Sequence, residues 1–201
     1  MTPSPRTTNK VVVGRRPKNR AVDLDSRAAI LRAAKTVFAR RGYEGASMRE
    51  VAEVARVNNA MIYYHFKDKL QLYRAVLADS FVAFDRVWEH DIFRSPAPAR
   101  KKIHAYVEEL VRFQHANEEF RKILSMEFAS CGKNMKWLSD NFFSHSYVKL
   151  ARIIKDGIRN GEMKKIDPAV GLCALVGMVI HTFILRPIAA YVTGRPMELA
   201  V

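Results

Sequence analysis

The chain has 201 residues, of which 49% are hydrophobic and 27% charged, as in a soluble globular protein of one or two domains. Its formal net charge of +14 favours a polyanionic partner, either nucleic acid or an anionic membrane surface. The two cysteines, Cys131 and Cys173, form no CxxC pair, which argues against a disulfide framework and fits a reducing, cytoplasmic environment.

The first 22 residues form a basic segment without acidic residues and with few that could build a core. We interpret residues 1–22 as a disordered basic arm. Such an arm can add phosphate contacts or enter a minor groove, and it can equally be a solvated tail. Its apolar stretch, Val11–Val13, is too short for the core of a signal peptide. The basic residues of the arm are Arg6, Lys10, Arg15, Arg16, Lys18 and Arg20.

A first helix is predicted after this arm. Asp25 or Ser26 can cap its start, and Gly42 is a natural residue to follow its end. Apolar residues recur at helical spacing between these points, so one face of the helix should be buried. They are Ile30, Ala33, Ala34, Val37 and Phe38.

Residues 47–70 read as two short helices joined by a tight turn, followed by the start of a third. Ser47 and Glu50 have the spacing of a capping box, which predicts a helix from Met48. Asn58 or Asn59 can cap the second helix, whose apolar positions Ile62 and Phe66 point inward. The opposite side is polar and aromatic, as a helix that reads a DNA groove requires. That side carries Asn59, Ala60, Met61, Tyr63 and Tyr64.

The rest of the chain also predicts helices, so we expect an all-α fold. A long helix capped by Asp68 should pass through Leu70, Tyr73, Leu77, Phe81, Phe84 and Trp88. Helices are further predicted at about 99–115, 118–130 and 140–160, and after Asp167-Pro168, which have Asp at the cap and Pro at the first position. We divide the chain into the arm, a helix-turn-helix domain at 23–70, and a larger helical domain at 71–201, to which the family resemblance described next assigns ligand binding and dimerisation.

These elements resemble the DNA-binding signature of the TetR family of bacterial transcription regulators over roughly residues 26–77. The resemblance implies a homodimer on double-stranded operator DNA and a small-molecule inducer. One residue departs from the pattern: Arg56 stands where the family usually carries Gly, so we expect a positive φ there. The matching elements are Ile30-Leu31-Arg32-Ala33-Ala34, Val37-Phe38, Gly42-Tyr43, Ser47-Met48-Arg49-Glu50-Val51-Ala52, Val57, Ile62-Tyr63-Tyr64-His65-Phe66 and Lys69-Leu70.

Candidate DNA contacts follow from this arrangement. Arg49 can present a planar fork to guanine, and a solvent-facing arginine is the alternative. Lys69 matches a phosphate-binding lysine of the family and would act with the N-terminal dipole of its helix. Tyr63, Tyr64 and His65 resemble the family's Tyr-x-His, which contacts phosphates; packing is the alternative for each. The predicted DNA-binding set is Ser47, Arg49, Asn59, Ala60, Met61, Tyr63, Tyr64, His65 and Lys69.

The second domain is rich in large apolar groups that can line a cavity between helices. Each of them can equally be ordinary core. Glu127, His104, His145 and His181 are the candidate polar anchors, and Cys131 is a weak candidate redox sensor. The predicted ligand-binding set is Phe84, Trp88, Tyr106, Phe113, Met126, Glu127, Phe143, Tyr147, Met178 and His181.

Residues 169–185 are the least polar stretch, yet they fall short of a transmembrane helix and include His181 and Thr182. Small residues Gly171, Ala174 and Gly177 would admit a second helix, so a subunit interface is the preferred interpretation. TetR-like proteins dimerise through their last two helices and usually continue into another helix. Here either that helix is absent or a preceding one takes its place.

No motif for catalysis, a phosphate loop or a metal is present, so we expect no enzyme, cofactor or metal. The leading hypothesis is a cytoplasmic, homodimeric regulator of transcription, a repressor released by a small apolar or aromatic ligand. An enzyme or carrier that reuses a helical fold is the first alternative, and residues 47–70 argue against it. A basic protein attached to a membrane through residues 169–185 is the second.

Overall fold

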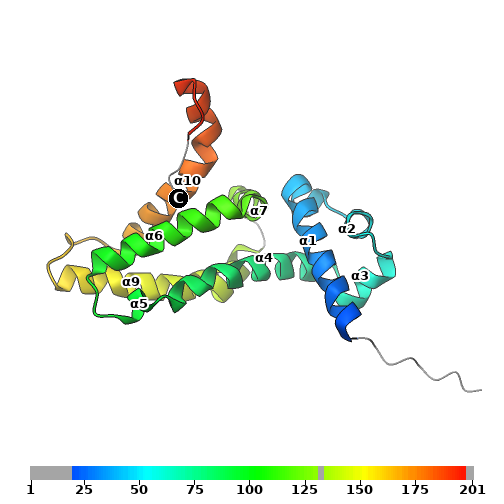
Figure 1. Ribbon diagram of the computed structural model, residues 1–201, viewed down its shortest axis with the longest axis horizontal. Coiled ribbons are helices and arrows are strands. Elements are labelled where there is room, and N and C mark those ends of the chain that lie inside the picture. The colour runs from blue at the N-terminus through cyan, green and yellow to red at the C-terminus, as the bar shows by residue number, and fades with distance from the viewer. Residues whose placement is uncertain (1–19, 131–133, 198–201) are drawn as a thin grey trace, which may run out of the picture.

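The computed structural model describes residues 20–130 and 134–197, with side chains from Asp23 onward. Within these ranges every regular element is a helix, which confirms the predicted all-α fold (Figure 1). The predicted basic arm and Cys131 lie outside the described residues, apart from the backbone of residues 20–22. The elements are α1 (Arg20–Gly45), α2 (Met48–Ala55), α3 (Asn59–His65), α4 (Lys69–Asp85), η1 (Arg86–Glu89), α5 (Asp91–Arg94), α6 (Ala99–Ala116), α7 (Glu118–Ala129), α8 (Met135–Leu138), η2 (Ser139–Phe143), α9 (Ser144–Arg159) and α10 (Pro168–Thr193).

Side-chain caps fix the starts of four helices, as the sequence predicts. Ser47 Oγ accepts the N–H of Glu50 at 3.1 Å, and Asn58 Oδ1 accepts the N–H of Ala60 at 2.9 Å. An aspartate caps each of the two later helices: Asp68 Oδ1 lies 2.8 Å from the N–H of Gln71, and Asp167 Oδ1 lies 2.8 Å from that of Ala169. Each cap satisfies an N–H that has no partner within its helix.

Three helix boundaries differ from the expectation. α1 begins at Arg20, before the predicted caps Asp25 and Ser26, and it carries Asp23 in its first turn, where an acid suits the helix dipole. At Gly42 the backbone leaves the helix with φ 68°, and a final turn continues to Gly45. α4 ends at Asp85, so Trp88 lies in the separate 3₁₀ turn η1.

One apolar core joins the amino-terminal helices to α7. Phe38 of α1, Ile62 of α3, Tyr73 of α4 and Phe120 of α7 all belong to this cluster and are almost fully buried. Figure 1 shows α1–α3 at one end of α4, with α6 and α9 along its other half. A second cluster forms there around Trp88, Tyr106, Leu150 and Phe183. The helix-turn-helix therefore shares its core with the region that follows it.

α10 has one face on the protein and one face exposed. Val179 and Phe183 are buried, whereas Met178, Leu185, Ile188 and Val192 are exposed. These four lie at i, i+7, i+10 and i+14, so they form a continuous apolar stripe along one side of the helix. The carboxy-terminal half of α10 rises away from the other helices (Figure 1). By length and composition α10 is the one helix in the described ranges that could cross a membrane, which is weak evidence by itself.

Candidate DNA-binding surface and ligand cavity

Packing against α1 holds the candidate recognition helix α3 in place. Val51 and Ala52 of α2 and Ile62 of α3 are buried in the core that Phe38 of α1 completes. Asn58 ends the turn between α2 and α3 and caps α3. Because one side of α3 is committed to this core, its other side must face solvent.

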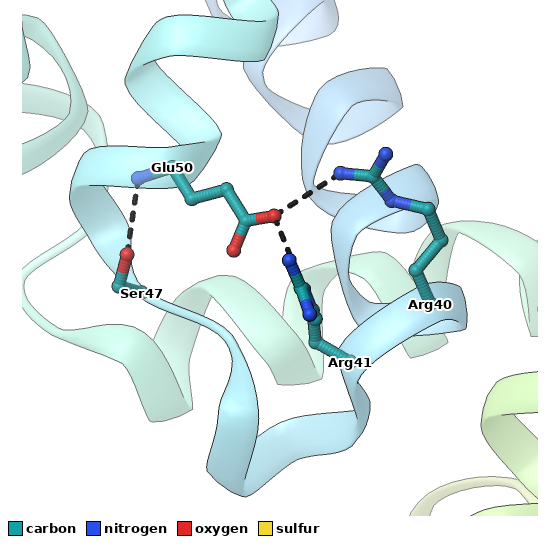
Figure 2. A network of polar contacts seen from close by, with 4 residues as sticks. All are labelled: Arg40, Arg41, Ser47 and Glu50. Atoms are coloured by element: carbon teal, nitrogen blue, oxygen red, sulfur yellow. Dashed lines mark hydrogen bonds and ion pairs between the residues drawn. The ribbon is translucent and has the colours of Figure 1, made fainter.

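Glu50 fastens α2 to the end of α1. Its Oε1 lies 3.1 Å from Nη2 of Arg40 and 3.6 Å from Nε of Arg41, as Figure 2 shows. The carboxylate thus points to two guanidinium groups instead of back to the backbone of Ser47, because two cations attract it more strongly than one amide does. Only the serine half of the predicted capping box is therefore formed.

The turn between α2 and α3 places a residue that has a Cβ in left-handed backbone geometry. Arg56 has φ 55° and ψ 42°, and in the described ranges no other non-glycine residue has a positive φ. Its N–H donates to Glu53 O at 3.2 Å, and the N–H of Val57 donates to Ala52 O at 3.0 Å. This pair of bonds is a Schellman motif, whose left-handed position glycine normally occupies. The predicted positive φ at Arg56 is confirmed.

The exposed face of α2 and α3 carries most of the predicted DNA-contacting residues. Arg49 is 86% exposed and forms an ion pair with Glu53 one helical turn away, at 3.2 Å. Tyr63 and Tyr64 are about half exposed, and Met61 is 38% exposed. The surface contains Ser47, Arg49, Asn59, Ala60, Met61, Tyr63 and Tyr64. It combines a guanidinium, an amide and phenol hydroxyls, all of which can bond base edges or phosphates.

Two residues predicted to contact DNA, His65 and Lys69, interact with other groups of the protein. The side chain of His65 is 6% exposed, and its Nε2 lies 3.7 Å from Asp23 Oδ1. Lys69 Nζ donates to the backbone oxygens of Glu44 and Ala46 at 3.2 Å each, and it lies over the ring of Tyr43 at 4.6 Å. The Lys69 ammonium group therefore ties the end of α1 to the start of α4 and keeps only one donor for another partner. The structure thus gives His65 a packing role in place of an open phosphate-binding position.

A cavity of about 400 Å³ opens between α4, α6, α7, α9 and α10. Six of the predicted ligand-binding residues line it, and each brings an aromatic ring or an imidazole. They are Phe84, Tyr106, Phe113, Phe143, Tyr147 and His181. The Tyr106 side chain is buried, and this burial, together with the nearby Asp85 carboxylate, raises the pKa of its hydroxyl. The neutral phenol and the surrounding rings make this an apolar site, as predicted from composition.

Four predicted ligand-binding residues lie elsewhere. Trp88 packs in the second core, and its indole N–H donates to Ser146 Oγ at 3.3 Å. Met178 is 69% exposed, because it lies on the outer side of α10. Met126 and Glu127 lie on the side of α7 that faces α1. Helical spacing identified these residues as apolar or semi-buried, but it could not show which neighbour each side of the helix faces.

Glu127 is a buried acid that joins α4 to α7. It is 5% exposed, and its two oxygens accept the Tyr73 hydroxyl at 2.9 Å and the N–H of Asn134 at 3.1 Å. Burial, and next the hydrogen bond to Glu127, raise the pKa of Tyr73, which therefore stays a neutral donor. These groups border a second cavity of about 630 Å³ between α1, α4 and α7. Helix α7 thus lies between two cavities and lines both.

Gln114 lines the first cavity and was not predicted. It is 4% exposed and lies four residues after Leu110 and seven after Val107, two apolar positions of α6. That periodicity places Gln114 on the buried face, so the pattern itself contained the signal. Arg121 of α7 was also missed; its guanidinium donates to the backbone oxygen of Gln114.

No group of three His, Cys, Asp or Glu residues that could hold a metal ion gathers in the described part of the chain.

Comparison with known proteins points to one family of transcription regulators. Residues 30–76 match the sequence model of bacterial regulatory proteins of the tetR family, and this segment spans α2, α3 and the flanking halves of α1 and α4.

Two curated relatives are transcription regulators. The chain is 34% identical over 121 residues to the HTH-type transcriptional activator FasR of Mycolicibacterium smegmatis, a match that covers 58% of this chain and 53% of that protein. It is 28% identical over 182 residues to the HTH-type transcriptional regulator TtgR of Pseudomonas putida, with 86% of each covered. The chain thus matches about half of the first relative and most of the second.

Solved structures share the fold. A Clostridium perfringens fatty acid metabolism regulator matches with a TM-score of 0.73 at 21% identity, covering 85% of this chain and 89% of that one. FadR from Bacillus subtilis, solved with stearoyl-CoA, matches with a TM-score of 0.69 at 19% identity, covering 82% and 88%. The exposed recognition face, the match over residues 30–76 and these two relatives agree: the helix-turn-helix segment of the chain is that of the TetR family of bacterial transcription regulators, whose members bind DNA.

Proposed function

We propose that this protein is a cytoplasmic, homodimeric repressor that leaves its operator when a small apolar ligand fills the cavity of about 400 Å³. The observation that carries the proposal is the position of α7. One side of α7 lines this cavity through Phe120, Leu124 and Phe128, and its other side meets α1 through Met126 and Glu127.

The DNA-binding step uses the exposed face of α2 and α3. Arg49 would pair with guanine at the groove edge, and the start of α3, at Asn59 to Met61, would meet base edges. Tyr63 and Tyr64 are exposed and would bond phosphates, and the third donor of Lys69 would do the same. The formal net charge of +14 would favour DNA binding, because basic residues that neutralise phosphates release counterions.

A dimer is proposed to form through the exposed stripe of α10. Met178, Leu185, Ile188 and Val192 together leave a long apolar surface in water, which a second copy would cover. The stripe runs beside Gly177, which itself lines the cavity and where an added Cβ would have no neighbour within 4 Å. Two copies would then present two α3 helices to successive major grooves about 34–36 Å apart.

The oligomeric state tests this interface. Met178→Arg should give monomers that bind operator weakly, because a bare charge would have to be buried against the partner. Val82→Arg is the matched control, since Val82 of α4 is 58% exposed outside this stripe. Sedimentation that shows dimers for both variants would refute the α10 interface. Release from cells without detergent separates the dimer from attachment of α10 to a membrane.

The ligand is proposed to be an apolar molecule with an extended aliphatic or aromatic body. At the cavity the ring of Phe81 stacks on that of Phe142 at 4.6 Å and meets that of Phe143 edge to face at 5.3 Å, and these rings offer no charge to a polar ligand. Because the FadR neighbour was solved with stearoyl-CoA, acyl chains are the first compounds to test. A cavity of this volume is at the lower end of the range for small-molecule sites.

The coupling between the two sites is proposed to run through α7 and α4. A ligand that displaces Phe120 or Leu124 would move α7 against α1, and the hydrogen bond from Tyr73 to Glu127 would carry the shift into α4. By linkage, operator DNA must weaken ligand binding by the same factor, typically about 5–150-fold.

The experiment begins with an operator selected from random duplexes by the purified protein. Operator affinity is then titrated with and without acyl ligands, and transcription from a promoter that carries the operator is measured. Lower transcription with protein, restored by ligand, supports the proposal. Higher transcription with protein would make it an activator, and equal operator affinity with and without a bound ligand would exclude this switch.

A further inference from the structure

The first cavity contains a buried amide whose oxygen finds no hydrogen-bond partner in the described part of the protein. Gln114 is 4% exposed, lines the cavity, and its Oε1 has no hydrogen-bond partner there. The cavity walls are mostly apolar, and Phe84, Phe113 and Phe120, which belong to them, cannot bond this oxygen. A buried polar group without a partner costs roughly 1–3 kcal/mol. An apolar residue at position 114 would avoid that cost, so the unpaired oxygen suggests a partner that enters the cavity.

Contacts from α7 and α10 hold the backbone of Gln114 in place. Arg121 of α7 donates to the backbone oxygen of Gln114, and its guanidinium lies over the ring of Phe183 in α10, 4.8 Å from the centroid. Three helices therefore meet at this residue. Burial lowers the pKa of the Arg121 guanidinium from its ordinary value; Glu118 opposes this shift and Arg186 adds to it. The backbone of Gln114 is thus anchored while its side chain faces the cavity.

We propose that Gln114 is the specificity-determining anchor of the cavity, and that the ligand carries one neutral hydroxyl or amide N–H that donates to its side-chain oxygen. This inference rests on the proposed function, since it names the polar feature of the ligand that enters the same cavity. The apolar walls bind the body of the ligand, and the amide fixes its orientation. A ligand without the donor would leave Gln114 unpaired and would be discriminated against.

A second buried polar group provides a matched control. Ser80 of α4 is 3% exposed, its Oγ also has no partner among the described residues, and it does not line this cavity. Substitution of either residue by a similar apolar one removes an unpaired buried group. Both Gln114→Leu and Ser80→Ala should therefore leave the free protein as stable as the wild type or more stable. Only the first should change which ligands bind.

The test measures binding of two probes, 1-decanol and 1-methoxydecane, by displacement of the apolar dye N-phenyl-1-naphthylamine. These probes share a ten-carbon chain and differ in the hydroxyl donor. The ratio of the dissociation constant of the ether to that of the alcohol should fall at least about fivefold in Gln114→Leu and stay unchanged in Ser80→Ala. Melting temperature is measured for the same proteins without ligand.

The outcomes distinguish failure of the Gln114 anchor from failure of ligand binding in the cavity. An unchanged ratio in Gln114→Leu, with both probes binding, overturns the anchor and leaves the cavity as an inducer site. A melting temperature that falls in Gln114→Leu shows a structural role and also overturns it. Failure of decanol to displace a bound dye excludes the proposed ligand class. If neither the dye nor any acyl ligand binds the wild-type protein, the proposed function fails with it.

Discussion

Replacing Arg56 with glycine should stabilise the protein. The left-handed geometry of Arg56, φ 55° and ψ 42°, brings its Cβ close to the following carbonyl oxygen and costs roughly 1–2 kcal/mol. Glycine avoids this clash but loses more conformational entropy on folding, and this loss offsets about 0.5–1 kcal/mol of the stabilisation. The net expectation for Arg56→Gly is a gain of about 0.5–1 kcal/mol in the free energy of unfolding. For a chain of this size, a gain of that order raises the melting temperature by roughly 1–4 °C.

Arg56→Ala is the control, because it keeps the Cβ and the strain but removes the charge. Urea unfolding of the wild type and both variants would measure the differences. We expect Arg56→Gly to lie above the other two proteins, with the hydrogen bond from Val57 to Ala52 retained in all three. If glycine and alanine give equal stability, strain at this turn is negligible and the reasoning is wrong. A reduced dependence of DNA affinity on salt in both variants would show that the charge is retained for a phosphate.

Three further substitutions test the DNA-binding face and the connection between the domains. Arg49→Ala should lose about 1–3 kcal/mol on the selected operator and much less on scrambled duplex, because only the operator offers a fixed guanine; equal losses would make Arg49 a phosphate ligand. Lys69→Ala should lower the melting temperature, since its ammonium holds the carbonyls of Glu44 and Ala46 at the end of α1, and should reduce the slope of log affinity against log salt by about one; an unchanged slope would exclude the phosphate contact. Tyr73→Phe should cost about 1–3 kcal/mol of stability in urea, because buried Glu127 loses a donor, and should weaken the effect of ligand on operator binding; full retention of that effect would remove this bond from the switch.

Local signals predicted the helices well because they act within a few residues. Ser47, Asn58, Asp68 and Asp167 each cap a helix, and each is recognisable from its residue type and the pattern after it. The positive φ of Arg56 followed from its place in the family signature.

The ligand site was predicted less completely, because it depends on which helix faces which. Met178 and Phe183 look alike in an apolar run, yet the first is exposed and the second is buried. Glu127 was expected to meet a ligand and instead binds Tyr73, which lies 54 positions earlier in the chain. Spacing within one helix carries no information on such distant partners.

The shared core that joins α1–α4 to α7 bears on how this protein can be divided and recombined. A fragment that ends at residue 70 would lose Leu72, Tyr73 and Phe120 from its core and leave Phe38 facing water. Its isolated expression would expose apolar surface that favours aggregation. A chimera that exchanges sensing regions between regulators must therefore bring along a surface of α7 that fits α1.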